Sequence, residues 1–258
     1  MGAPFFYMRT VSTGSATAAA GGEHAERGSL GGPRRAFVLR RLHSLSGVLP
    51  LGVFLAVHLW TNATLLGGRA PFDHAVADIQ RTPLLPVVEV VGVLLPLAFH
   101  AIFGVVLATQ GRANVAAYPY ARAWAYVFQR ITGVVTLVFV LAHLWELRVQ
   151  KWLFGMSELA FYDTLVGHMS AVTAGLLVVA IGYLFGVAAS VFHLANGLVT
   201  FALTWGLVAS RAAQRRLSRV AAALGLLLFL LGASTVLSVA TGARLPVSPA
   251  PAAGSACP

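Results

Sequence analysis

The chain has 258 residues, of which 58% are hydrophobic and only 10% are charged, whereas soluble domains average about 25% charged residues, so the composition predicts an integral membrane protein. The net charge of +10 comes mostly from arginines that cluster between apolar runs, which is typical of the positive-inside bias of membrane proteins and argues against a nucleic-acid partner. The single cysteine, Cys257, excludes Cys-ligated zinc, iron–sulfur clusters and CxxCH haem attachment.

Taken in chain order, residues 1–33 are rich in Gly, Ala and Ser, which predicts a flexible cytoplasmic arm rather than a signal peptide. Five apolar runs follow, and each can supply the roughly 20 residues of a transmembrane helix. The runs lie between Arg41 and Arg69, between Glu89 and Arg112, from Trp124 to Glu146, within 164–210, and between Arg219 and Arg244. We therefore predict an all-α, five-helix membrane domain at 34–243 in contact with membrane lipid, and a disordered tail at 244–258.

The fourth run has two interpretations, because no charged residue occurs from Thr164 to Ser210. One helix of that length would measure about 70 Å, more than twice the hydrocarbon thickness. Two spans would place the arginines of 211–219 outside, whereas one span keeps every arginine cluster on the side of the N-terminus. We predict one span with a lead-in at 160–172, a cytoplasmic N-terminus and a C-terminus outside.

Histidine occurs once in each of the first four spans, as His58, His100, His143 and His193. A single intramembrane histidine is as well explained by hydrogen-bonded packing as by function, but four are harder to dismiss. Their contexts alternate as HLW, FHxxxG, HLW, FHxxxG, which indicates a two-helix unit used twice. Equivalent helices run in the same direction, so we expect His58 opposite His143 toward the outer face and His100 opposite His193 toward the inner face.

Facing imidazoles can bind zinc, copper or haem iron. Zinc favours four close ligands, and copper usually brings sulfur ligands, which these positions lack. Haem needs only two axial ligands, so we predict two bis-histidine haems b stacked across the bilayer. Small residues that bring the helices close are Gly52, Gly92, Gly104, Gly133 and Gly197. The alternative is a non-haem bundle in which the histidines pack or relay protons.

Four segments resemble the dihaem cytochrome b subunit of succinate dehydrogenase and fumarate reductase: RRLHSLSGVLPLGVFLAVHL, LPLAFHAIFGV, QRITGVVTLVFVLAHLWE and VFHLANGLVTFALTWG. The resemblance covers about 34–240. It implies that His58 and His143 hold a low-potential distal haem, and that His100 and His193 hold a high-potential proximal haem. It also implies a quinone substrate, usually menaquinone, and the inner (cytoplasmic) membrane of a bacterium.

The same resemblance implies that a flavoprotein and an iron–sulfur subunit dock on the cytoplasmic face, in a complex that can form higher oligomers. Electrons then pass from the iron–sulfur subunit through the haems to quinone. The succinate chemistry itself cannot reside in this chain, because the sequence has neither a dinucleotide fingerprint nor room for a soluble domain. A rival is the haem b subunit of a hydrogenase or formate dehydrogenase. Subunits of the bc type place two histidines on one helix, unlike this chain.

Other polar residues are candidates for contacts with the haem propionates and the quinone. Arg41, His43 and Ser44 at the cytoplasmic end of the first span, with Arg130, could bind propionates, because guanidinium pairs well with carboxylate. The alternative for the arginines is interfacial anchoring.

Quinone reduction requires proton donors at the ring oxygens. By position, Asp73 is the nearest match to the acid that fumarate reductases of the family carry before the second span, with Asp78 and Glu89 as rivals. A solvated loop acid is the plain alternative for each of the three.

Overall fold

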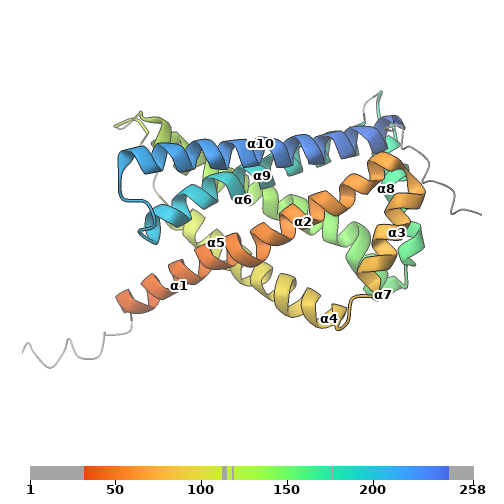
Figure 1. Ribbon diagram of the computed structural model, residues 1–258, viewed down its shortest axis with the longest axis horizontal. Helices are drawn as coiled ribbons and strands as arrows, with labels where there is room; N and C mark the ends of the chain where they lie inside the picture. The colour runs from red at the N-terminus through yellow and green to blue at the C-terminus, as the bar shows by residue number, and fades with distance from the viewer. Residues whose placement is uncertain (1–31, 112–114, 118, 176, 244–258) are drawn as a thin grey trace, which may run out of the picture. The chain divides into compact units, whose positions relative to one another are not determined.

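The computed structural model describes residues 32–111, 115–117, 119–175 and 177–243, and every regular element in these ranges is helical (Figure 1). Five helices are long and apolar enough to cross a membrane, which confirms the predicted five-span, all-α architecture. They are Arg34–Gly67, Leu85–Gln110, Ala121–Phe154, Val178–Thr204 and Arg211–Thr241. The predicted tail and all but the last two residues of the predicted arm lie outside the described residues, and those two residues are already helical.

The chain divides into two compact units, Met1–Arg41 and Leu42–Pro258. The boundary falls within the first helix, α1, which runs from Gly32 to Ser46. The histidines of the predicted sites all belong to the second unit.

The first span continues from α1 through a π-helical turn, a second α-helix and a 3₁₀ turn. These are η2 (Gly47–Leu51), α2 (Gly52–Asn62) and η3 (Ala63–Gly67). Pro50 lies inside the π turn. Since proline has no N–H to donate to the preceding turn, the backbone widens locally instead of continuing as a regular α-helix.

The second and third spans also contain π turns. The second consists of α4 (Leu85–Val87), the π turn η4 (Val88–Leu94) and α5 (Leu95–Gln110). Pro96 lies at the start of α5. Like Pro50, it has no N–H to donate, so a backbone hydrogen bond is missing just after this π turn.

The third span consists of α6 (Ala121–His143), the π turn η5 (Leu144–Val149) and α7 (Gln150–Phe154). It is longer than predicted and has no proline in its π turn. That turn begins directly after His143, and π turns are frequent at functional sites.

The fourth span is the single helix α9 (Val178–Thr204), as predicted. The expected lead-in forms the 3₁₀ turn η6 (Glu158–Ala160) and α8 (Phe161–Ser170). The fifth span, α10 (Arg211–Thr241), begins earlier than predicted, at Arg211, because the Ser210 side chain accepts a hydrogen bond from the Ala213 N–H and caps the helix.

An additional helix, α3 (Arg69–Gln80), which was not predicted from the sequence, joins the first two spans. Its Phe72 is buried against Tyr162 of α8, and Val76, one turn later, packs on the same cluster. This i, i+4 apolar pair was visible in the sequence and is the signal that would have predicted the helix.

Buried residues lie mainly on α8, α9 and α10, whereas α5 and α6 contain none in the described chain. α9 packs against both α6 and α10. Side chains such as Ile102 and Val138 remain largely exposed, as expected for helices that face lipid instead of water.

Charge separates the second unit into two ends. Every Asp and Glu of the described chain lies with α3, η4, η5, η6 and α8, which we call the carboxylate end: Asp73, Asp78, Glu89, Glu146, Glu158 and Asp163. Salt bridges join Arg69 to Asp163, Arg148 to Glu89 and Lys151 to Glu158 there. The arginine end comprises the α5–α6 and α9–α10 connections, with Arg122, Arg130, Arg211, Arg215, Arg216 and Arg219.

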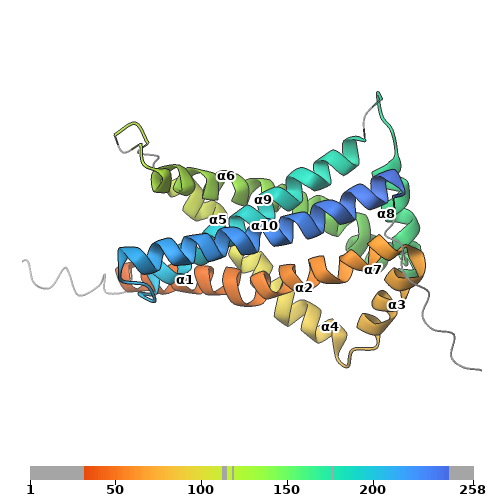
Figure 2. The same cartoon turned by 45° about the horizontal axis from the view of Figure 1, so that its top comes forward.

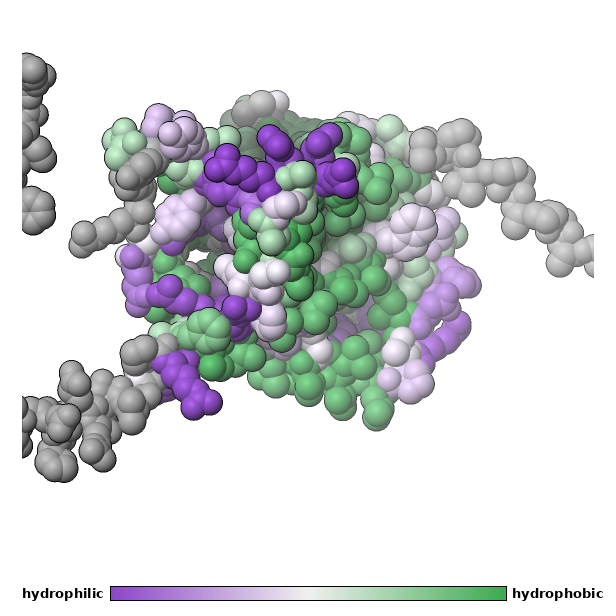
Figure 3. Space-filling view, turned by 60° about the vertical axis from the view of Figure 1, so that its left-hand side comes forward, coloured by the Kyte–Doolittle hydropathy of each residue, from purple (hydrophilic) through white to green (hydrophobic). Residues whose placement is uncertain are grey.

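The views agree with this division. α3, α7 and α8 gather at one end of the second unit, and the α9–α10 connection lies at the other (Figures 1 and 2). When the latter end is brought forward, strongly hydrophilic patches are seen around it, with hydrophobic surface along the helices between the ends (Figure 3).

Candidate haem and quinone sites

The four intramembrane histidines lie in two pairs, and each pair joins different helices. The rings of His58 on α2 and His143 on α6 have centroids 5.7 Å apart, with their planes at 73°. The rings of His100 on α5 and His193 on α9 have centroids 6.1 Å apart, at 90°. The first pair lies toward the carboxylate end and the second toward the arginine end, and the two are named accordingly below.

The geometry of both pairs fits axial ligation of haem better than a zinc site. No group of three or more His, Cys, Asp or Glu side chains in the described chain is placed to hold a metal ion, so zinc would lack its usual ligands. A metal–imidazole bond is about 2 Å long, so two opposed imidazoles on one metal have centroids about 6 Å apart. Both observed separations are close to that value.

In the arginine-end pair, backbone carbonyl groups orient both rings. His100 Nδ1 donates to the carbonyl of His43 over 2.9 Å, and His193 Nδ1 donates to the carbonyl of Gln129 over 3.0 Å. Because a carbonyl can only accept, the proton of each neutral ring lies on Nδ1. Each Nε2 therefore keeps the lone pair that a metal requires.

Two equivalent glycines lie beneath these rings. Gly47 follows His43 by four residues, just as Gly133 follows Gln129. A Cβ on Gly47 would collide with the His100 ring, and a Cβ on Gly133 would lie 2.9 Å from His193 Cε1. Only glycine lets the imidazole lie this close to the neighbouring backbone. Gly133 was among the small residues predicted to bring the helices close, whereas Gly47 was not.

In the carboxylate-end pair, side chains take the place of the carbonyl groups. His143 Nδ1 lies 3.1 Å from the Tyr183 hydroxyl, and that hydroxyl donates to the Glu146 carboxylate. The amide nitrogen of Asn62 lies 3.4 Å from Nδ1 and 3.3 Å from Nε2 of His58. Neither Tyr183 nor Glu146 was given a role in the sequence analysis.

Comparison with known proteins gives the family. No family model matches the chain. The succinate dehydrogenase cytochrome b558 subunit of Bacillus subtilis (strain 168) is 37% identical over 182 residues, which cover 70% of this chain and 86% of the relative. The chain belongs to the succinate dehydrogenase cytochrome b558 family.

As a cytochrome b558 subunit, the chain is a haem b-binding membrane subunit of succinate dehydrogenase, respiratory complex II, and its partners are the other subunits of that complex. The bacterial relative points to the cytoplasmic membrane. Family membership removes the hydrogenase and formate dehydrogenase alternatives, as well as the non-haem bundle.

One of the propionate candidates of this cytochrome b558 subunit, His43, lies against the arginine-end pair. The His43 ring stacks on His100, with centroids 4.0 Å apart and planes at 11°. The Ser44 hydroxyl accepts a hydrogen bond from Trp205 Nε1 over 3.0 Å. His43 Nδ1 is buried without a hydrogen-bond partner among the described residues, and such an atom is costly unless a polar group of a ligand satisfies it.

Arg130 has a similar orphaned atom. Its guanidinium lies over the Tyr126 ring at 3.5 Å, and its Nε is buried without a partner. A Cβ on Gly111 would collide with this guanidinium, which places Arg130 against the end of α5. Arg41 belongs to the other compact unit, where its guanidinium lies over the Phe37 ring at 4.9 Å.

Among the quinone candidates, Asp73 differs from its rivals in its partners. Glu89 is paired with Arg148, and Asp78 with Arg81 and His74. Within the described chain, Asp73 has only a 4.0 Å contact with Arg69, and its Oδ1 is buried without a hydrogen-bond partner. It lines a hollow of about 310 Å³ at the carboxylate end, together with Gln80 and Arg81.

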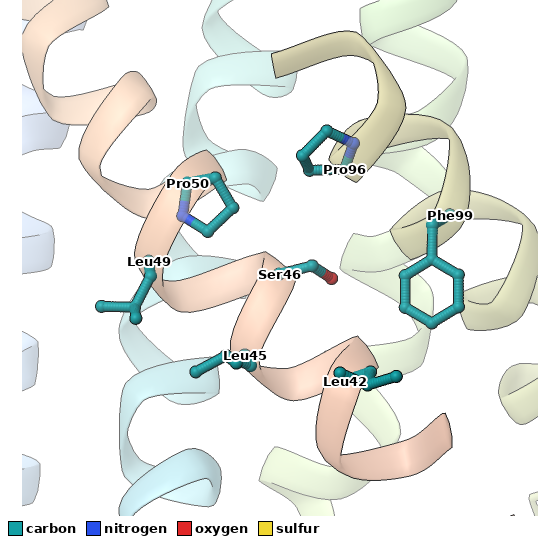
Figure 4. A pocket seen from close by; sticks show the side chains of 7 residues that line it. All are labelled: Leu42, Leu45, Ser46, Leu49, Pro50, Pro96 and Phe99. Atoms are coloured by element: carbon teal, nitrogen blue, oxygen red, sulfur yellow. The ribbon is translucent and has the colours of Figure 1, made fainter. Parts of the chain in front are cut away.

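An apolar groove of about 360 Å³ lies between the first span and α5. Its walls are Leu42, Leu45, Ser46, Leu49, Pro50, Pro96 and Phe99, and Figure 4 shows the Ser46 hydroxyl directed toward the α5 side. The Ser46 hydroxyl donates to the same His43 carbonyl that accepts the hydrogen bond from His100 Nδ1. The groove therefore adjoins the support of the arginine-end pair.

Proposed function

We propose that the chain binds two haems b, one through His58 and His143 and the other through His100 and His193, and passes electrons from an iron–sulfur subunit to quinone, with menaquinone as the expected substrate. The observation that supports this most strongly is the arrangement of two opposed imidazole pairs, one toward each end of the bundle. Haem b supplies one-electron transfer between ferric and ferrous iron.

The chain's own residues fix the geometry of this transfer. The hydrogen bonds at Nδ1 of His100, His193 and His143 hold the rings in one orientation and leave Nε2 as the nitrogen that can ligate iron. His43, Ser44 and Arg130 hold propionates at the arginine end, with Arg41 as a further candidate. The orphaned nitrogens of His43 and Arg130 are the support for this assignment.

Charge supports the orientation. Cytoplasmic loops of membrane proteins carry an excess of arginine and lysine, so the arginine end faces the cytoplasm and receives the flavoprotein and iron–sulfur subunits. The N-terminus then lies in the cytoplasm and the C-terminus outside. The carboxylate end faces outward, where Asp73 supplies protons as quinone takes up two electrons and two protons to become quinol.

The test is the haem content of the complex, expressed with its flavoprotein and iron–sulfur subunits. We expect two haems b per chain and b-type bands in the reduced-minus-oxidised spectrum. His58→Ala should remove about half of the haem signal, because one of the two ligand pairs is broken. His74→Ala is the matched control, since this histidine is 77% exposed on α3 and pairs with Asp78, away from both histidine pairs. One haem in the wild type, or full haem in His58→Ala, would contradict the proposal.

A further inference from the structure

Four side chains at the carboxylate end form a continuous chain of hydrogen bonds. It runs from His143 to Tyr183 on α9, then to Glu146 in η5, and finally to His168 on α8. Glu146 is largely buried, with 14% of its side chain exposed, whereas His168 is 57% exposed. This series of hydrogen bonds therefore links the candidate haem ligand His143 to the surface.

The direction of each hydrogen bond in this series is fixed by which groups can donate and which can accept. A carboxylate only accepts, so the Tyr183 O–H donates to Glu146 and the phenolic oxygen is left to accept from His143 Nδ1–H. His168 Nδ1 donates to the other Glu146 oxygen. Each bond polarises the next, so negative charge on Glu146 draws the Nδ1 proton away from His143 and makes that ring a stronger electron donor.

Aromatic packing keeps Tyr183 in this position independently of its hydroxyl. Its ring lies edge-on to Phe139, with centroids 5.3 Å apart, and edge-on to His143, at 5.7 Å. Phe139 itself stacks on His143. A phenylalanine at position 183 should therefore keep the packing and lose only the hydrogen bond.

In the described chain, no carboxylate is linked by hydrogen bonds to the arginine-end pair. His100 and His193 both donate to uncharged backbone carbonyls, and every carboxylate of the described chain lies at the other end. The internal repeat shows the same asymmetry, since Thr61 stands three residues after His58 where Glu146 stands three after His143.

We propose that Tyr183 and Glu146, steadied by His168, are positioning residues that increase the basicity of His143 and so lower the reduction potential of the carboxylate-end haem relative to that of the arginine-end haem. A more basic axial ligand favours ferric over ferrous iron. The inference rests on the proposed ligation by His143, and it adds the source of the difference between the two haems.

The experiment is a redox titration of both haems in the intact complex, for wild type, Tyr183→Phe and Glu146→Gln. We expect Tyr183→Phe to raise the reduction potential of the carboxylate-end haem. A tenfold change in the equilibrium between ferric and ferrous iron, which is about 59 mV for one electron, is the expected order of magnitude. Glu146→Gln should shift this potential in the same direction but less, because the amide can still accept from Tyr183. The arginine-end haem is the internal control and should not move.

Tyr162→Phe is the matched control variant, since that buried ring on α8 packs on Phe72 and beneath the Arg69 guanidinium, and it should leave both potentials at the wild-type values. Unchanged potentials in both test variants, or equal shifts of both haems, would overturn the inference while leaving the proposed function intact. If Tyr183→Phe loses haem, Glu146→Gln alone decides. A wild-type complex without two haems would instead contradict the proposed function.

Discussion

The two histidine pairs share one chemistry but differ in what surrounds them. At the arginine end, backbone carbonyls accept from Nδ1 of both rings, and Gly47 and Gly133 lie beneath them. At the carboxylate end, the corresponding acceptor for His143 is a tyrosine backed by a carboxylate. The internal repeat thus duplicates the ligands without duplicating their partners.

The two pairs therefore differ in how readily a single substitution can change the hydrogen bond at Nδ1. A backbone carbonyl is present whatever the side chain, so the arginine-end orientation tolerates substitutions as long as the helix and its glycine remain. A side-chain acceptor can be removed or charged by one substitution. The carboxylate end is therefore the place where sequence change can alter electronic properties without moving a helix.

The largest expected effect comes from removing one ligand of each pair in turn. His100→Ala and His58→Ala should each lose a single haem, because each breaks only one pair. Redox titration should then show that the haem left in His100→Ala has the lower potential, and the haem left in His58→Ala the higher. Equal potentials in the two variants would show that the different surroundings of the two pairs do not set different haem potentials.

Quinone reduction should depend on the carboxylate end. In Asp73→Asn we expect the rate of quinone reduction to fall about 100-fold, because an amide cannot deliver the proton, while the haem spectrum stays unchanged. Asp78→Asn is the matched control, since this neighbouring carboxylate is already engaged by Arg81 and His74. Equal losses in both variants would show that Asp73 has no special role.

A steric test addresses the arginine end. Gly133→Ala places a methyl group 2.9 Å from His193 Cε1, and we expect it to cost about 1–3 kcal/mol of stability, measured as a lower temperature of haem release. Gly92→Ala serves as the control, because the nearest atom to its Cβ is 3.9 Å away. Matching release temperatures for the two variants would mean that the His193 ring does not depend on this close approach.

The smallest expected effect is the pH dependence of a surface pair. A hydrogen bond from Lys151 lowers the pKa of Glu158 below its ordinary value of 4.5. The pair therefore stabilises the fold above about pH 4.5, and this contribution is lost as the pH falls through the lower folded-state pKa. Because Glu158 is solvent-accessible, Glu158→Gln should cost less than about 0.5 kcal/mol at neutral pH. Thermal melts at pH 7 and pH 3 should differ less for the variant than for the wild type.

Some parts of the candidate site could be predicted from the sequence, and others could not. The repeated HLW and FHxxxG motifs predicted which histidines face each other, and the i, i+4 pair Phe72 and Val76 could have predicted α3. No local pattern joins His143 to Tyr183, which lie 40 residues apart on α6 and α9. Their hydrogen bond depends on how these two helices pack.

By itself, the sequence determined the number of spans and their helical form, because hydrocarbon thickness sets the length of an apolar run and lipid leaves no other partner for the backbone. It also determined that charge is unevenly shared between the ends. Tertiary structure alone decided which atom accepts from each Nδ1, whether a Cβ fits beneath a ring, and which carboxylates find a cation. Those outcomes depend on distances of a few ångströms between residues far apart in the chain, and motif spacing does not encode them.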